Sequence, residues 1–229
     1  FILLSIGLFP YLLLGNPQYQ RYQGADASRF ITGATEVVVD EVTNRIEYID
    51  FGPGLPFNAE TPGDALLGAL KMSPEYSLVP LGIEVEEAQV THRRYSLSYK
   101  GVPLQDGMVV LHLQDNVILA ANGGIHRKMN IANDRVLPAE AARSNALRHV
   151  GAQLYRWEVP GEDEHLRWET GDAQATYFPA GKLLLLPHAG DDASVHRYAW
   201  EFEIYSVQPL GRHQLFIDAE TGELLQEID

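Results

Sequence analysis

The sequence predicts an α+β protein made of two successive units, each a helix followed by an antiparallel sheet. Helical patterns begin near Thr61 and near Pro138, and a series of short β patterns follows each of them. A helix with one apolar stripe and strands with alternating apolar residues bury those surfaces against each other, which gives helix-on-sheet layers. The repetition of this order predicts two domains.

Composition restricts the classes of function. Hydrophobic residues make up 45% of the 229 residues, which is enough for a substantial core. The formal net charge of −14, from 31 acidic and 17 basic residues, argues against binding to nucleic acid or to anionic lipid. The absence of cysteine excludes disulfides, thiolate zinc sites and cysteine nucleophiles.

The N-terminal segment has the pattern of a secretory signal peptide. Residues 1–15 are almost wholly apolar, contain Pro10 and are shorter than the ~20 residues that a membrane span needs. A polar stretch follows, with an Ala-Asp-Ala cleavage pattern at residues 25–27. We therefore expect residues 1–27 to be a signal peptide remnant and lead-in, and the protein to be secreted. The alternative interpretation is an ordinary buried helix or strand.

Residues 28–57 are expected to form an N-terminal extension with one β-hairpin. Two β-rich stretches, residues 35–40 and 45–51, are separated by a short polar turn. The sequence Gly-Pro-Gly-Leu-Pro at residues 52–56 then predicts a linker.

Residues 58–132 make up the first predicted helix-plus-sheet unit. Its helix opens with Pro62 in the first turn, where proline is favoured. A β-meander over residues 92–119 follows, in which a strand, a Gly-Val-Pro turn and two further strands succeed one another. In the first of these strands, apolar and polar residues alternate with the period of two expected of a half-buried strand.

Residues 133–229 make up the second predicted unit. Its helix ends before Gly151, a glycine placed for a C-cap. The acidic stretch at residues 158–171 is interpreted as a solvated loop. Residues 213–225 have a strand–turn–strand pattern, in which Gly222 can adopt the positive φ that such a turn needs.

The meander carries a recognisable set of residues: His92, Arg94, Tyr95, Tyr99, Gly101, Pro103 and His112. The set resembles the fungalysin/thermolysin propeptide domain, which is the N-terminal pro-region of secreted zinc metalloproteases. Leu97 and Asp106 depart from that family, which usually has glutamine and glycine at these positions.

The C-terminal turn carries a second set: Asp218, Thr221 and Gly222. This strand, Asp-Ala-Glu-Thr-Gly-Glu turn and strand resemble the close of a PepSY domain, the module that follows the first in thermolysin-type pro-regions. The combined similarity runs in order over residues 58–229. Residues 151–157 and 177–186 are most similar to the large secreted thermolysin-like proteases of Bacteroidetes-type bacteria.

The resemblance implies that the chain is the pro-region of a secreted thermolysin-like zinc metalloendopeptidase. It would act in cis as an intramolecular chaperone and inhibitor of a catalytic domain that lies C-terminal to this fragment and holds the zinc. The tail residues expected to be directed to the active-site cleft are Leu224, Leu225 and Ile228. The alternative is a stand-alone secreted inhibitor or binding module of the PepSY type. No nucleic acid partner is expected, and no membrane partner beyond the signal peptide.

The fragment itself is not expected to be an enzyme. None of its eight histidines belongs to an H-E-x-x-H motif, and the sequence contains no G-x-S-x-G or P-loop pattern. We therefore expect no catalytic residue, metal or cofactor in this chain. Turn chemistry explains Asp218 and Glu220 better than a glycosidase-like carboxylate pair does.

Two interpretations of the propeptide residues stay open at this point. They contact the protease, or they fix the strand and the turn, and the second is favoured by the residue types. The three tryptophans, Trp157, Trp168 and Trp200, are interpreted as core or interface anchors.

Overall fold

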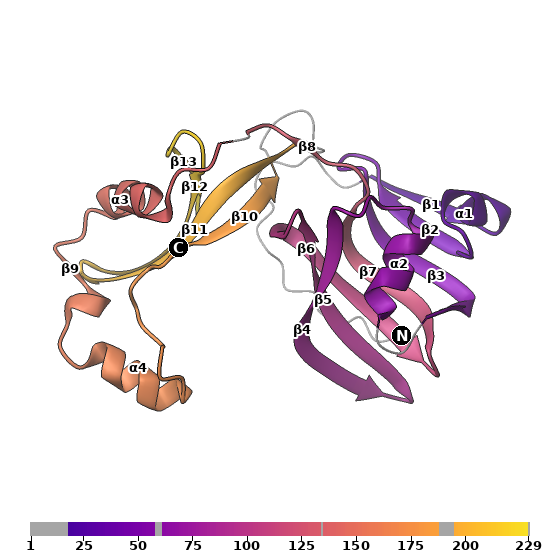
Figure 1. The fold of residues 1–229 in the computed structure, drawn as a ribbon, viewed down its shortest axis with the longest axis horizontal. Helices are drawn as coiled ribbons and strands as arrows, with labels where there is room; N and C mark the ends of the chain where they lie inside the picture. Colours follow the sequence, from indigo (N-terminus) through magenta and orange to yellow (C-terminus); the bar gives the residue numbers. More distant parts are fainter. Residues whose placement is uncertain (1–17, 58–60, 134, 188–194, 229) are drawn as a thin grey trace. The chain divides into compact units, whose positions relative to one another are not determined.

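The computed structural model describes residues 18–57, 61–133, 135–187 and 195–228. Strands dominate the fold, with 52% of the chain in strands and 19% in helices (Figure 1). Among the described residues, hydrogen bonds join 13 strands into a mixed sheet. The predicted α+β class with two helix-plus-antiparallel-sheet units is therefore wrong, because the protein is mostly β. Of the helices described, none has the length and apolarity needed to cross a membrane.

The chain divides into two compact units. The first contains the described residues up to Gly101, Asp106–Met129, and the two described end residues of the segment Pro187–Val195. The second contains Val102–Gln105, Asn130–Leu186 and His196–Asp229. The predicted boundary at residues 132 and 133 lies three residues from this division. Most of the predicted signal peptide lies outside the described residues.

The first unit is a sheet with two short helices. In chain order its elements are β1 (Tyr19–Gln23), α1 (Ala25–Phe30), β2 (Glu36–Asp40), β3 (Arg45–Pro56), α2 (Pro62–Ala69), β4 (Tyr76–Glu87), β5 (Val90–Tyr99), β6 (Val102–Gln114) and β7 (Val117–His126). The strands lie in the order β1-β2-β3-β7-β6-β5-β4. The predicted meander is confirmed, since β5, β6 and β7 are neighbours.

The N-terminal extension belongs to this sheet. The predicted hairpin is confirmed as β2 and β3, which pair antiparallel. The predicted linker at residues 52–56 is wrong, because β3 runs on to Pro56. Its register against β7 shifts between Asp50 and Leu55, so Gly-Pro-Gly forms an irregularity within the strand.

The lead-in also takes part in the fold from Tyr19 onward. Strand β1 pairs with β2, with Tyr19 opposite Asp40. The Ala-Asp-Ala pattern lies inside α1, and Ala27 is fully buried. Cleavage at that pattern would cut the chain between β1 and its partner strand β2.

The sheet of the first unit has a covered face and an open face. Helix α2 packs against β4 and β3, and its Leu66 is fully buried. Along β6, Leu111 is fully buried, whereas its neighbour His112 is only half-buried and Met108 is exposed. This alternation is typical of an antiparallel sheet with one solvated side.

The second unit contains β8 (Asn130–Ile131), α3 (Ala139–Val150), β9 (Leu154–Tyr155), the 3-10 helix η1 (Arg156–Glu158), α4 (Glu162–Thr170), β10 (Lys182–Pro187), β11 (Val195–Gln208), β12 (Leu210–Asp218) and β13 (Leu224–Ile228). The four longer strands lie in the order β10-β11-β12-β13, and β8 and β9 pair with β11. The first residues of β6 also belong here, where Leu104 pairs in parallel with Leu185 of β10.

Two apolar clusters hold this unit together. The predicted helix is confirmed as α3, with Gly151 in the left-handed region at its C-cap. The cluster on the α3 side consists of Ala142, Ala146, Phe202, Ile204, Leu215 and Ile217. The second cluster consists of Leu184, Leu186, Ala199 and Phe216. Because Leu215 and Ile217 belong to one cluster and Phe216 to the other, β12 is buried on both faces.

The acidic stretch at residues 158–171, predicted as a loop, is instead largely helix α4. Three acidic residues stand in its first turn, at Glu162, Asp163 and Glu164. Carboxylates in this position stabilise the positive end of the helix dipole, so the acidic composition favours a helix start here rather than a loop.

Candidate functional site

Two histidines of the propeptide set meet on the first unit. His92 lies on β5 and His112 on β6, and their Nδ1 atoms are 2.7 Å apart. The Nε2 atom of His112 lies 2.5 Å from Oδ1 of Asn122 on β7. Three adjacent strands thus contribute one side chain each to a continuous polar chain.

The hydrogen-bond pattern fixes the protonation of this pair. The Asn122 carbonyl oxygen can only accept, so the hydrogen of neutral His112 is on Nε2. Its Nδ1 atom is then an acceptor, and His92 donates from its own Nδ1. Burial lowers the pKa of His112, the hydrogen bond to Asn122 opposes this effect, and His92 adds to it. His112 is therefore held as a neutral acceptor.

Acid should destabilise the first unit through His112. Since the folded pKa of His112 is below the unfolded value of about 6.5, its contribution is complete above that pH and is lost as the pH falls below it. We expect His112→Gln to flatten the fall in melting temperature between pH 7 and pH 5, measured by circular dichroism. His165→Gln, at an exposed site, is the control and should leave the slope unchanged. An unaltered slope in the His112 variant would contradict this assignment.

The other residues of the propeptide set lie on β5, in the turn that follows it and at the start of β6. Tyr95 is buried opposite Pro80 of β4. Tyr99 packs against Tyr76 at a ring distance of 4.9 Å and donates a hydrogen bond to Glu75. Arg94 is half-buried on β5, Gly101 lies in the turn before β6, and Pro103 lies at the start of β6. The contact that the structure shows within this set is the one between His92 and His112.

Asp106, a departure from the family pattern, has its own partners on the first unit. Its Oδ2 atom accepts hydrogen bonds from Arg45, at 3.0 Å, and from His126, at 2.8 Å. Arg45 also contacts Glu47, whose pKa is raised by burial in spite of the guanidinium. Neither Asn122 nor this group was found by sequence reasoning, since both depend on which strands pair.

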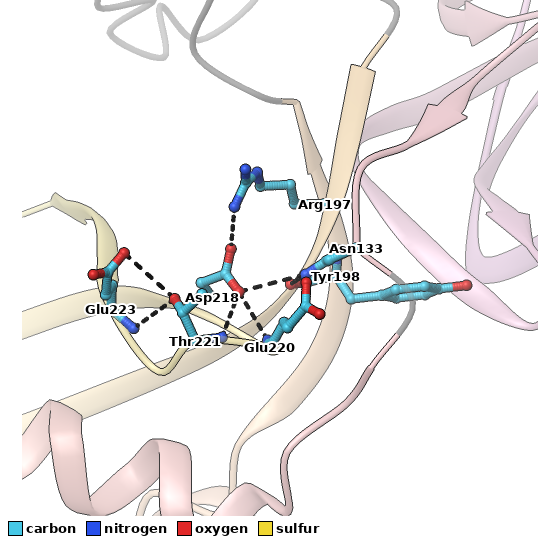
Figure 2. A network of polar contacts seen from close by, with 7 residues as sticks. All are labelled: Asn133, Arg197, Tyr198, Asp218, Glu220, Thr221 and Glu223. Carbon is cyan, nitrogen blue, oxygen red and sulfur yellow. Dashed lines mark hydrogen bonds and ion pairs between the residues drawn. The ribbon is translucent and has the colours of Figure 1, made fainter.

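The PepSY set forms the turn between β12 and β13 in the second unit (Figure 2). The carboxylate of Asp218 is fully buried. One of its oxygens accepts the backbone N–H groups of Glu220, at 2.8 Å, and Thr221, at 2.9 Å. The other accepts a hydrogen bond of 2.7 Å from Arg197. Burial would raise the pKa of Asp218, but the two N–H donors and Arg197 together hold it below its usual value.

The surrounding residues lock the same turn. Asn133 donates to the Asp218 carboxylate at 3.4 Å and accepts from the backbone N–H of Tyr198 at 2.8 Å, so it connects three segments (Figure 2). Gly222 has φ of 76°, and a side chain there would overlap Asn145 of α3. Both oxygens of the Asp218 carboxylate are thus used to hold the turn, as the turn interpretation predicts.

The three tail residues do not share one environment. Leu225 and Ile228 pack against the cluster that contains Phe216, whereas Leu224 is 37% exposed. Between them, Glu227 is held by His149 of α3, at 2.8 Å, and by His213 of β12, at 3.0 Å. These contacts lower the pKa of Glu227, that of His149 most. Among the described strands β13 pairs with β12 alone and so lies at an edge of the sheet. The direction of the tail toward a protease cleft stays a prediction.

Comparisons with known proteins add one distant likeness. No family model and no curated protein matches the chain. Among solved structures, the chain is similar to the Bacillus megaterium YpeB C-terminal domain, with 11% sequence identity and a TM-score of 0.36 over 93% of this chain and 89% of that chain. A likeness this weak carries no argument about function.

Proposed function

We propose that this chain is the pro-region of a secreted zinc metalloendopeptidase. It would chaperone the folding of a catalytic domain encoded C-terminal to it and would then inhibit that domain. The observation that carries the proposal is the order of the two residue sets, the first within residues 92–112 and the second within residues 218–222. All of the first set except Pro103 belongs to the first compact unit, and the second set belongs to the second unit.

The last strand suggests how inhibition would work. Among the described residues β13 pairs only with β12, so it is an edge strand that reaches Ile228 in extended conformation. A peptide that continues from it would leave the sheet extended, the conformation in which a substrate groove can hold it. Because Leu225 and Ile228 are packed against the second unit, the residues that follow Ile228 are better placed than the tail itself to enter the groove.

Covalent linkage would strengthen this inhibition without new contacts. A segment tethered to its target has an effective concentration of roughly millimolar, so modest intrinsic affinity keeps a zymogen closed. Cleavage after the second unit would remove the tether, and digestion of the pro-region would complete activation.

The proposal is tested by inhibition in trans. Residues 18–229, which retain β1, are mixed with the catalytic domain encoded downstream or with another thermolysin-like endopeptidase. We expect slowly consumed inhibition with a nanomolar inhibition constant, and mass spectrometry will locate the cleavage sites. A matched version that carries about ten further encoded residues should inhibit more tightly.

Three outcomes would count against the proposal or a part of it. Rapid digestion of both versions without inhibition, and no gain in refolding yield of the denatured catalytic domain, would exclude both proposed roles. Equal inhibition by both versions would exclude the role of the continuing segment. A coding sequence that stops soon after Asp229 would favour the stand-alone inhibitor instead.

A further inference from the structure

Helix α4 exposes a tryptophan side chain to solvent. Trp168 is 79% exposed, whereas Trp157 and Trp200 pack against the α3-side core. No residue of this nine-residue helix is buried. The helix therefore adds nothing to the core, while it exposes the side chain with the largest apolar area to solvent.

The helix is nonetheless fixed in place by polar contacts. Asp163 accepts hydrogen bonds from the Thr176 hydroxyl, at 2.7 Å, and from the backbone N–H of Tyr177, at 2.9 Å. Arg167 donates to the Ala175 carbonyl at 3.0 Å. Before the helix, Arg156 donates to Glu162 at 2.8 Å. These contacts pre-organise α4, so that a partner that binds it loses less conformational entropy.

Acidic residues flank Trp168 along the chain. Glu164 lies one helical turn before Trp168, Glu169 follows it directly and Asp172 lies just beyond the helix end at Thr170, and all three are exposed. Arg167, which precedes Trp168, is paired with Asp163 at 3.7 Å. The ring of His165 stacks with the indole at a centroid distance of 5.9 Å. We call Glu164, His165, Trp168, Glu169 and Asp172 the Trp168 surface. Its exposed tryptophan is typical of an interface hot spot, and its three acidic residues, which we call its acidic rim, favour a basic partner.

We propose that the Trp168 surface docks the pro-region onto the catalytic domain, into an apolar pocket bordered by lysine or arginine side chains. This inference rests on the proposed function and names the contact through which it acts. The negative charge of the surface favours a basic pocket on the catalytic domain as its binding partner. A second copy, with the same net charge of −14 and the same acidic rim, would repel the surface, as would an anionic membrane.

The test measures binding of residues 18–229 to the catalytic domain encoded downstream, inactivated at its zinc-site glutamate so that the chain survives. We expect Trp168→Ala to raise the dissociation constant at least about tenfold and Trp168→Phe to raise it less. Leu210→Ala removes the other strongly exposed apolar side chain of this unit, at 89% exposure, and should leave the constant unchanged. Melting temperatures should not change, because α4 has no buried residue.

The acidic rim is tested by charge removal. Glu164→Gln with Glu169→Gln should slow association and weaken its dependence on salt. Glu86→Gln with Glu87→Gln removes the same charge from exposed sites on β4 of the first unit. If the two pairs had the same effect, only net charge would matter, and the proposed rim would be wrong.

Fluorescence reports on the indole directly. The emission of Trp168 is obtained as the difference between the spectra of the wild-type chain and of Trp168→Phe. In the complex this emission should shift to shorter wavelength and resist acrylamide quenching. Binding of the wild-type chain with an unchanged constant for Trp168→Ala would overturn the Trp168 surface and leave the pro-region function standing. Failure of the wild-type chain to bind would overturn both. A dimer of the chain that Trp168→Ala abolishes would give the surface another occupant and would also overturn the proposal.

Discussion

Asp218→Ala should unfold the second unit under conditions in which the wild-type chain is folded. The fully buried carboxylate accepts two backbone N–H groups and the Arg197 guanidinium. Removal of the acceptor leaves these donors unpaired inside the protein, which costs about 3 kcal/mol or more of unfolding free energy. Trp200, which packs on the core of this unit, makes its unfolding visible by fluorescence in urea.

The conservative variant separates charge from shape. Asp218→Asn keeps the size and one carbonyl acceptor but cannot ionise. Because the folded pKa of Asp218 is below the unfolded value of about 3.9, its contribution is complete above that pH and is lost as the pH falls through the folded pKa. Between pH 5 and pH 2 the unfolding free energy of the wild-type chain should therefore fall more than that of Asp218→Asn, which lacks the contribution of the carboxylate at every pH.

Asp115→Asn is the control for this titration. Asp115 is exposed, and asparagine tolerates its positive φ of 48°. It should follow the wild-type curve at every pH. Parallel acid unfolding of Asp218→Asn and wild type would mean that the carboxylate is not ionised in the folded state, and the network of Figure 2 would need another explanation.

Local signals in the sequence predicted the elements that local chemistry determines. Pro138 near the start and glycine at the C-cap located α3, and glycine with positive φ located the turn after Asp218. Both depend on residues within a few positions of one another. The same reasoning failed at residues 52–56, because their pairing partner, β7, lies some 60 positions further along the chain.

The prediction of the fold class was wrong for the same physical reason. Which strands join a sheet depends on long-range burial, and nothing near Tyr19 in the sequence indicates that β1 will pair with β2. The two predicted helices are present but short, and the N-terminal hairpin adds its strands to the sheet of the first unit. Strand content therefore exceeds what two helix-plus-sheet units would give.

The candidate site, too, could be predicted from the sequence only in part. His92 and His112 were each found from a sequence pattern, but their contact requires the register of β5 against β6. Asn122 could have been noticed only once β7 was aligned with β6, where it lies opposite Val110. Alternation along strands predicts which face a side chain occupies, and it does not predict which residues of neighbouring strands face each other.

Gly123→Ala should be among the most damaging single substitutions in the first unit. Gly123 of β7 lies opposite Val109 of β6 with φ of +122°, and an added Cβ would overlap the Met108 carbonyl oxygen. Because the obstacle is backbone in the neighbouring strand, no side chain can move aside to accommodate the methyl group. We expect a loss of roughly 3–5 kcal/mol in unfolding free energy, measured in urea by circular dichroism.

Gly68→Ala supplies a matched substitution of opposite sign. Gly68 lies within helix α2 of the same unit, and an added Cβ would meet nothing within 4 Å. Alanine should therefore stabilise the unit by about 0.5–1 kcal/mol, through helix propensity and a less flexible unfolded chain. Two variants that add the same methyl group should thus move stability in opposite directions. If Gly123→Ala were tolerated as well as Gly68→Ala, β6 and β7 could not pair in this register, and the alignment that places Asn122 beside His112 would fall with it.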